Sequence, residues 1–348
     1  MIDQSCEPRY GGLGGGLMDQ MREAPGESGP AERARLQSAR GLRAELDYLL
    51  PQGSAEMGPR VVEWFTAALE RLAGEFVAAL PAEGLPSAVL RDPAGGPFGA
   101  EGSAWCSLWL IGQHERRLSK SLRAWSPKNW ERFLGQAADV SVEMSAKFST
   151  LNRFGHAGEP SLSVSAYRPR RREARQWLRL DASYVVGSLD ETSPIPDEVA
   201  GRWRDFIVSQ ALQSPLPVFG FVADDAFDAG ATRTPLEVRT QRFPTQTLRI
   251  TDSEVRGYSW ITVVSPGIVD RLDGVETLRA SGAFSDVTPL PAGGAVLQAT
   301  PRLSLYEGDA VRRVFVALGP VLPDKAPWPD EFALFKLIYE APRHRHST

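Results

Sequence analysis

The stretch that decides the fold reads GYSWITVVSP at residues 257–266 and continues to Pro320. Residues 257–264 are mostly aromatic or β-branched, a composition typical of a buried strand. Ser265-Pro266 then indicates a helix start. A serine side chain accepts hydrogen bonds from the free amides of a first helical turn, and a proline there has no amide to lose. The stretch therefore predicts a strand followed at once by a helix.

The rest of this stretch predicts the body of that helix, a hairpin and a last helix. Apolar residues at three-to-four spacing continue to Gly282, with Asp273-Gly274 as an interruption. Two short strands at 284–290 and 295–300 flank the residues PAGG, whose glycines allow the backbone of a hairpin turn. A last helix is expected over 309–318. The unit is a packing scaffold, and none of its residues points to a chemical reaction.

Several residues of this stretch form a pattern known from one protein family. They are Trp260, Ser265-Pro266, Val269, Leu272-Asp273-Gly274, Leu278-Arg279, Gly293-Gly294 and Leu297-Gln298-Ala299. The pattern resembles the carboxy-terminal part of bacterial immunity proteins of type VI secretion and related polymorphic-toxin systems. In that family a small α+β protein neutralises a cognate toxin. The resemblance implies an α+β fold, a protein toxin as the partner and neutralisation by stoichiometric occlusion.

Composition and charge set the broad class. The 348 residues are 42% hydrophobic and include nine tryptophans, enough to bury a sizeable core. The formal net charge is −4, so the chain lacks the overall basic field that draws proteins to nucleic acid or anionic membranes. The sequence shows no secretory signal and no apolar run of spanning length. We therefore expect a cytoplasmic protein with no nucleic-acid and no membrane partner, and its oligomeric state stays open.

The order of patterns predicts the organisation of the chain. A disordered leader is expected over 1–30, which is rich in Gly, Pro and Glu, followed by a single α+β domain over 31–348. One arrangement left open is a helical portion over 31–137 packed on a sheet portion over 138–348. Alternating segments without a repeated βα order predict a largely antiparallel sheet flanked by helices. The expected helices are 31–50, 59–80, 128–137 and 198–212, and the expected strands are 104–111, 140–148, 162–166, 176–186 and 218–223.

The strongest enzyme-like string is Asp224-Asp225-Ala226-Phe227-Asp228. Its aspartate spacing matches that with which terpene synthases hold magnesium, since carboxylates one helical turn apart converge on a hard cation. Those enzymes are all-helical, whereas this string opens residues 224–255, which are expected to form a loop with some edge-strand pairing. A solvated turn or an acidic patch that faces a partner is therefore the favoured interpretation.

A concentrated positive charge falls at the tip of a predicted hairpin, where residues 168–172 read RPRRR. The guanidinium groups of Arg170, Arg171 and Arg172 can grip carboxylate or phosphate. The alternatives are a loop kept soluble by its charge, contact with an acidic partner, and contact with nucleic acid. Trp177 borders this tip and is either a core residue or an aromatic contact of an interface.

Other candidates for chemistry are isolated. His344 and His346 alternate as metal ligands sometimes do, but no third ligand lies near them in the sequence. Cys6 and Cys106 are the only cysteines, which excludes a disulfide framework and a four-cysteine metal site. The sequence also lacks the nucleophile elbow, the zinc-protease helix, the phosphate loop and the dinucleotide fingerprint.

These observations favour a binding protein over an enzyme. The favoured hypothesis is an immunity-type protein that occludes a cognate toxin, with no cofactor and no metal. Its expected partner contacts are Asp224, Asp225, Asp228, Arg170, Arg171, Arg172 and Trp177. The alternatives are a metal-assisted enzyme of unfamiliar class that uses Asp224 and Asp228, and a structural or regulatory protein-binding module.

Overall fold

The computed structural model describes residues 40–50, 55–85, 98–114, 117–137, 143–168, 177–186, 195–224 and 233–324. The strands are β1 (Arg40–Leu49), β2 (Ala104–His114), β3 (Arg117–Ala124), β4 (Glu143–Leu151), β5 (Ala157–Tyr167), β6 (Trp177–Val186), β7 (Phe219–Ala223), β8 (Ile261–Val264), β9 (Asp286–Pro289) and β10 (Ala295–Gln298). The helices are α2 (Met57–Arg71), α3 (Gly74–Ala79), α4 (Pro127–Gly135), α5 (Asp197–Ala211), α6 (Pro235–Arg239), α7 (Pro244–Thr247), α8 (Pro266–Arg271), α9 (Gly274–Ala280) and α10 (Asp309–Leu318). The expected leader, 1–30, lies outside the described residues.

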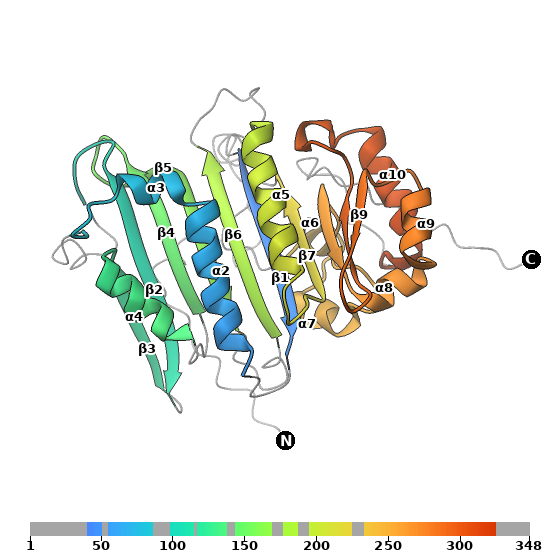
Figure 1. Cartoon of the computed structure of the whole chain (residues 1–348), viewed down its shortest axis with the longest axis horizontal. Coiled ribbons are helices and arrows are strands. Elements are labelled where there is room, and N and C mark those ends of the chain that lie inside the picture. Colours follow the sequence, from blue (N-terminus) through green and yellow to red (C-terminus); the bar gives the residue numbers. More distant parts are fainter. Residues whose placement is uncertain are drawn as a thin grey trace, which may run out of the picture.

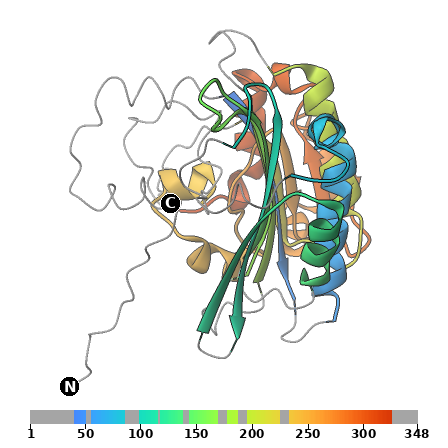
Figure 2. The ribbon, with the colours of Figure 1, turned by 90° about the vertical axis from the view of Figure 1, so that its left-hand side faces the viewer.

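The strands form one ten-stranded sheet in the order β3-β2-β4-β5-β6-β1-β7-β8-β10-β9 (Figure 1). Neighbouring strands pair antiparallel throughout this order. Helices lie on both faces of the sheet (Figure 2). The structure thus confirms the α+β class and the largely antiparallel sheet flanked by helices.

The central strand is β1, which pairs with β6 on one side and β7 on the other. Its two faces differ in chemistry, because successive side chains of a strand point to opposite sides. The side chains that face α2 and α5 are Leu42, Ala44, Leu46 and Tyr48. Those on the opposite face are Arg43, Glu45 and Asp47. The leucine spacing predicts a helix over 31–50, and this prediction is wrong for residues 40–49.

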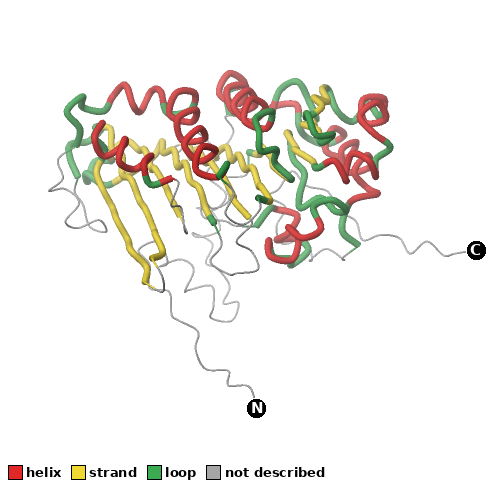
Figure 3. Tube along the Cα trace, turned by 60° about the horizontal axis from the view of Figure 1, so that its bottom comes forward, coloured by secondary structure: helices red, strands yellow, loops and turns green. Residues whose placement is uncertain are grey.

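The main core lies between the sheet and a layer formed by α2, α3, α4 and α5 (Figure 3). Trp64 of α2 contacts Phe206 of α5, with ring centroids 4.7 Å apart. Phe65 of α2 meets Phe133 of α4 edge-on at 5.0 Å. The α6 and α7 helices lie on the opposite face of the sheet (Figure 2). Residues 233–256 therefore cover the charged side of β1 rather than its apolar side.

The stretch after residue 257 folds largely as predicted, although β8 is shorter than the expected strand. The Ser265 side chain caps α8 by accepting a hydrogen bond from the amide of Ile268, at 3.4 Å. The predicted interruption separates α8 from α9 at Asp273, whose backbone is left-handed with φ 59°. The hairpin of β9 and β10 and the last helix, α10, occupy the predicted positions.

Elsewhere the structure differs from the sequence prediction. The described part of 224–255 contains α6, α7 and a 3-10 turn (Leu248–Ile250) rather than edge strands. Residues 117–124, for which no element was expected, form β3. The range 31–137 contributes β1, β2 and β3 to the sheet beside its helices, so it is not a helical portion. Leu212, at the end of the expected helix 198–212, would pack on the sheet if the apolar spacing of that helix continued, but it is 41% exposed.

Candidate functional site

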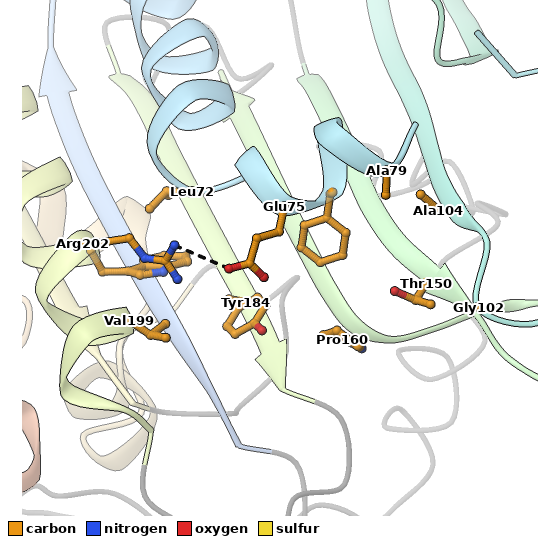
Figure 4. Close-up of a pocket in the computed structure, with 12 residues that line it drawn as sticks. Leu72, Glu75, Ala79, Gly102, Ala104, Thr150, Pro160, Tyr184, Val199 and Arg202 are labelled. Atoms are coloured by element: carbon orange, nitrogen blue, oxygen red, sulfur yellow. Dashed lines mark ion pairs between the residues drawn. The ribbon is translucent and has the colours of Figure 1, made fainter. Parts of the chain in front are cut away.

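We call the face of the sheet covered by α2, α3, α4 and α5 the helical side. A recess opens on the helical side of the sheet, between α3 and α5 (Figure 4). Its volume is about 150 Å³. The lining residues come from the end of α2, from α3 and α5, and from β2, β4, β5 and β6. The recess therefore forms only when segments far apart in the sequence come together.

The walls of the recess are apolar and belong to the core. Val199 and Trp203 are four residues apart on α5, so they project from one side of the helix. Leu72 and Phe76 are also four residues apart and flank the start of α3. The Phe76 ring lies 6.3 Å from that of Phe148, which is buried. Because these side chains pack against the core, the walls are held in place.

The floor of the recess is formed by strand residues on the helical side of the sheet. They are Tyr184 of β6, Pro160 of β5, Thr150 of β4 and Ala104 of β2. Each is partly exposed, whereas the neighbouring strand positions Leu162 and Phe148 are buried under the helices. Figure 4 shows Tyr184, Pro160 and Thr150 below α3. Because these residues are partly exposed, solvent reaches the sheet at this point.

The rim of the recess carries one acid and one base. Arg202 Nη1 lies 3.7 Å from Glu75 Oε1, and the two side chains are 52% and 86% exposed (Figure 4). Such an exposed pair contributes little to stability. Partial burial raises the pKa of Tyr184 above its ordinary value, and Glu75 raises this pKa further while Arg202 lowers it. The recess therefore combines a neutral phenol with a rim of no net charge.

A second concentration of charge lies buried against the opposite face of the sheet. Arg256 is its centre: Nε is 2.9 Å from Glu237 Oε1, Nη1 is 3.3 Å from Glu45 Oε1, and Nη1 also pairs with Asp47. Arg179 Nη2 is 3.0 Å from Glu45 Oε1. None of these residues is more than 3% exposed. We call these five residues the buried ion network.

Aromatic rings enclose the buried ion network. The guanidinium carbon of Arg256 lies 5.1 Å from the ring centroid of Phe219 and 5.9 Å from that of Trp177. The guanidinium carbon of Arg179 lies 4.7 Å from the Trp177 ring. The network is sealed from solvent and its charges pair with one another. It therefore holds residues 233–256 on the sheet and offers no surface to a substrate.

The contacts expected from the sequence are only partly within the described residues. Trp177 is 4% exposed, and its Nε1 donates a hydrogen bond of 2.7 Å to Asp47 Oδ1. This placement corresponds to the core alternative for that tryptophan. Asp224 is half-buried and directly follows β7. The remaining expected contacts, Asp225, Asp228, Arg170, Arg171 and Arg172, lie outside the described residues.

Trp177 and Asp224 lie near opposite ends of the central strand β1, which β6 and β7 flank. Trp177 pairs with Leu49 at one end of β1, and Ala223, the last residue of β7, pairs with Arg43 near the other end. Six residues of strand between these two pairs correspond to about 20 Å. The start of β6 follows the arginine-rich tip, and the end of β7 precedes the acidic string. The fold therefore does not bring these two strand ends together.

Two further searches concern metal sites and membrane spans. In the described ranges, no group of three or more His, Cys, Asp or Glu residues is arranged to hold a metal ion. Cys106 is buried, and burial raises the pKa of its thiol well above the ordinary value. His344 and His346 fall outside the part of the chain that the structure describes. None of the described helices is both long and apolar enough to cross a bilayer.

Comparisons with known proteins give a distant structural likeness. No family model and no curated protein matches the chain. Among solved structures, the chain is similar to the Pseudomonas aeruginosa T6SS protein PA0821, with a TM-score of 0.48 and 13% sequence identity. The alignment covers 82% of this chain and 74% of that chain. A likeness at this level does not assign a function.

Sequence reasoning missed both the recess and the buried ion network. Glu75 and Arg202 belong to separate helices, and no spacing rule links them. The network did leave a signal in β1, where Arg43, Glu45 and Asp47 alternate with apolar residues. Such alternation is typical of a strand with one apolar and one charged face. The signal shows the charged face but not the buried partner that covers it.

Proposed function

We propose that the chain is a binding protein that neutralises a cognate bacterial toxin by stoichiometric occlusion. It would act in the cytoplasm as an immunity-type protein of a type VI secretion or related polymorphic-toxin system, without cofactor or metal. The sequence pattern around Trp260 and Ser265-Pro266 supports this proposal, because it resembles that family. The pattern runs from Trp260, just before β8, through α8 and α9 to β10, and so it supports the scaffold more directly than the contacts.

The observation that carries the proposal is the size and setting of the recess. Pockets that hold a whole small molecule measure about 300–1,000 Å³. The recess, at about 150 Å³, is smaller than these. It has the apolar walls of an anchor site, and its rim residues, Glu75 and Arg202, are exposed where a second protein could contact them. Protein interfaces concentrate their binding energy in a few such anchors surrounded by a polar rim.

The charge of the chain fits a basic partner. The formal net charge is −4, and opposite charge speeds the encounter of two proteins. Within this proposal Asp224, Asp225 and Asp228 would meet basic groups of the toxin. Arg170, Arg171 and Arg172 would meet acidic ones. Trp177 would contact the toxin only after its side chain had left Asp47.

Co-expression tests the proposal. The products of the genes that flank the coding sequence would be expressed one at a time in a bacterial host, with and without this chain. We expect one product to arrest growth, the chain to restore growth, and the two proteins to co-purify at a fixed ratio measured by size-exclusion chromatography with light scattering. An unrelated toxin should not be relieved. If no flanking product is both relieved and bound by the chain, the proposed function is wrong.

A further inference from the structure

We propose that the recess between α3 and α5 takes the side chain of one tyrosine from the protein partner. This inference rests on the proposed function, because the occupant belongs to a protein that the chain binds. It goes further by naming the group that is recognised and the surface that recognises it. The partner would dock on the helical side of the sheet.

The volume of the recess fits a single aromatic ring. An engineered apolar cavity of about 150 Å³ binds benzene. The recess has the same volume, about 150 Å³, but is open to solvent on one side, so a ring can enter from a neighbouring protein without an opening of the core. An indole is larger than one ring, so a tryptophan fits less well.

The walls favour an aromatic occupant over an aliphatic one. Phe76 and Trp203 both line the recess and offer ring faces and edges from α3 and α5. Aromatic pairs in offset or edge-on contact attract each other beyond the effect of their buried area. Leu72 and Val199 complete the apolar lining. These side chains pack against the core, so they lose little freedom when the recess is filled.

The polar groups favour a neutral occupant with a hydroxyl. Glu75 would attract a cation and Arg202 would repel it, and the reverse holds for an anion, so the paired rim selects neither charge. Two hydroxyl groups, those of Tyr184 and Thr150, belong to residues of the floor. The Tyr184 hydroxyl makes no hydrogen bond to another described residue. A tyrosine inserted here can exchange hydrogen bonds with these groups, whereas a phenylalanine cannot.

Small probes test the recess without any partner. Calorimetric titration of the whole chain would use p-cresol, the analogue of a tyrosine side chain, and toluene, the analogue of phenylalanine. We expect p-cresol to bind more tightly than toluene. Ala79→Trp should abolish binding, because Ala79 is an exposed lining residue and an indole there fills the recess. Ala78→Trp is the matched control, since Ala78 is exposed on α3 but does not line the recess.

The same two variants test the docking itself. In the co-expression assay, Ala79→Trp should weaken the complex about tenfold or more and reduce growth rescue, while Ala78→Trp should leave both unchanged. Urea midpoints equal to that of the wild type would show that both variants fold. If the wild type rescues growth and Ala79→Trp rescues equally, the recess is not the docking site although the proposed function stands. If toluene binds as tightly as p-cresol, tyrosine is the wrong group.

Failure of the proposed function has a different signature. The wild type itself would then rescue no toxin and form no complex. In that case the proposal that a partner tyrosine docks here is also wrong, even if p-cresol binds. The recess would then bind a free phenol and not a side chain of a protein partner. Absence of p-cresol binding to the wild type also overturns the proposal, whatever the co-expression assay shows.

Discussion

The side chain of Arg256 lies 2.9 Å from that of Glu237, Nε to Oε1, and neither residue is more than 1% exposed. Glu237 belongs to α6, whereas Arg256 also reaches Glu45 and Asp47 on the central strand. The guanidinium group of Arg256 therefore links residues 233–256, which cover the charged side of β1, to β1 itself. This ion pairing adds to the buried apolar contacts of Leu236 and Val255 in holding residues 233–256 on the sheet.

Replacing Arg256 by methionine should destabilise the fold by about 3–5 kcal/mol, because the change removes the cation that pairs with Glu237 and leaves Glu45 and Asp47 with Arg179 as their shared buried partner. Urea denaturation followed by circular dichroism measures the loss. Arg204→Met is the control: Arg204 pairs with Asp205 on the exposed side of α5, so the same substitution should cost less than about 1 kcal/mol there. Equal losses in the two variants would contradict a special role for the network.

Glu237 should make stability depend on pH. Burial raises its pKa from 4.5 to about 7, against hydrogen bonds from Thr247 and from the Thr234 backbone that lower it. The folded state then holds the proton more tightly than the unfolded state. The resulting stability is complete below about pH 4 and is lost as the pH rises through 7, by up to about 1.4 kcal/mol per pH unit.

Glu237→Gln isolates this effect, because glutamine keeps the shape of the protonated acid and does not titrate. Between pH 5 and pH 8 the wild type should lose stability relative to the variant. Asp181 contributes in the same direction and remains in both proteins, since burial raises its pKa from 3.8 to about 6 while a hydrogen bond with Ser165 lowers it. A wild type that gains on the variant as the pH rises would reverse the sign and refute the prediction.

Local signals explain which parts of the fold the sequence predicts. The caps and turns of residues 257–320 act within a few positions of themselves: Ser265 starts α8, and Asp273 with Gly274 separates two helices. The central strand carries no such signal. Its acids Glu45 and Asp47 indicate a solvent-exposed face. Their burial is explained only by the pairing with Arg256, which lies 209 residues beyond Asp47 in the chain. The recess likewise depends on packing between α3 and α5, which no local pattern encodes.

Two buried tyrosines should respond differently to loss of their hydroxyl. The Tyr48 hydroxyl accepts hydrogen bonds from Arg60 Nε at 3.0 Å and from Nη2 at 2.8 Å. Tyr48→Phe removes that acceptor from a buried cation and should cost about 1.5–3 kcal/mol. Tyr306 is 1% exposed, and its hydroxyl has no hydrogen-bond partner among the described residues. Tyr306→Phe should leave stability unchanged or raise it by up to about 1 kcal/mol.

Chemical denaturation of the two variants under one set of conditions makes the comparison, because both changes delete a single oxygen atom. The difference between them then reports hydrogen bonding and not volume. A loss in Tyr306→Phe as large as that in Tyr48→Phe would mean that the Tyr306 hydroxyl has a partner after all.

Two glycines give the sharpest contrast between a closed and an open position. A Cβ added at Gly220 of β7 would lie 2.6 Å from the backbone oxygen of Glu45 and 2.5 Å from Leu46 Cδ2, and backbone in the middle of a sheet cannot move aside. Gly220→Ala should therefore cost about 1–3 kcal/mol or more through overpacking. At Gly201 in α5 a Cβ would meet nothing within 4 Å, so Gly201→Ala should add about 1 kcal/mol through helix propensity. A denaturation midpoint for Gly220→Ala that is equal to or above that of the wild type would show that β1 and β7 are not packed as closely as this register requires.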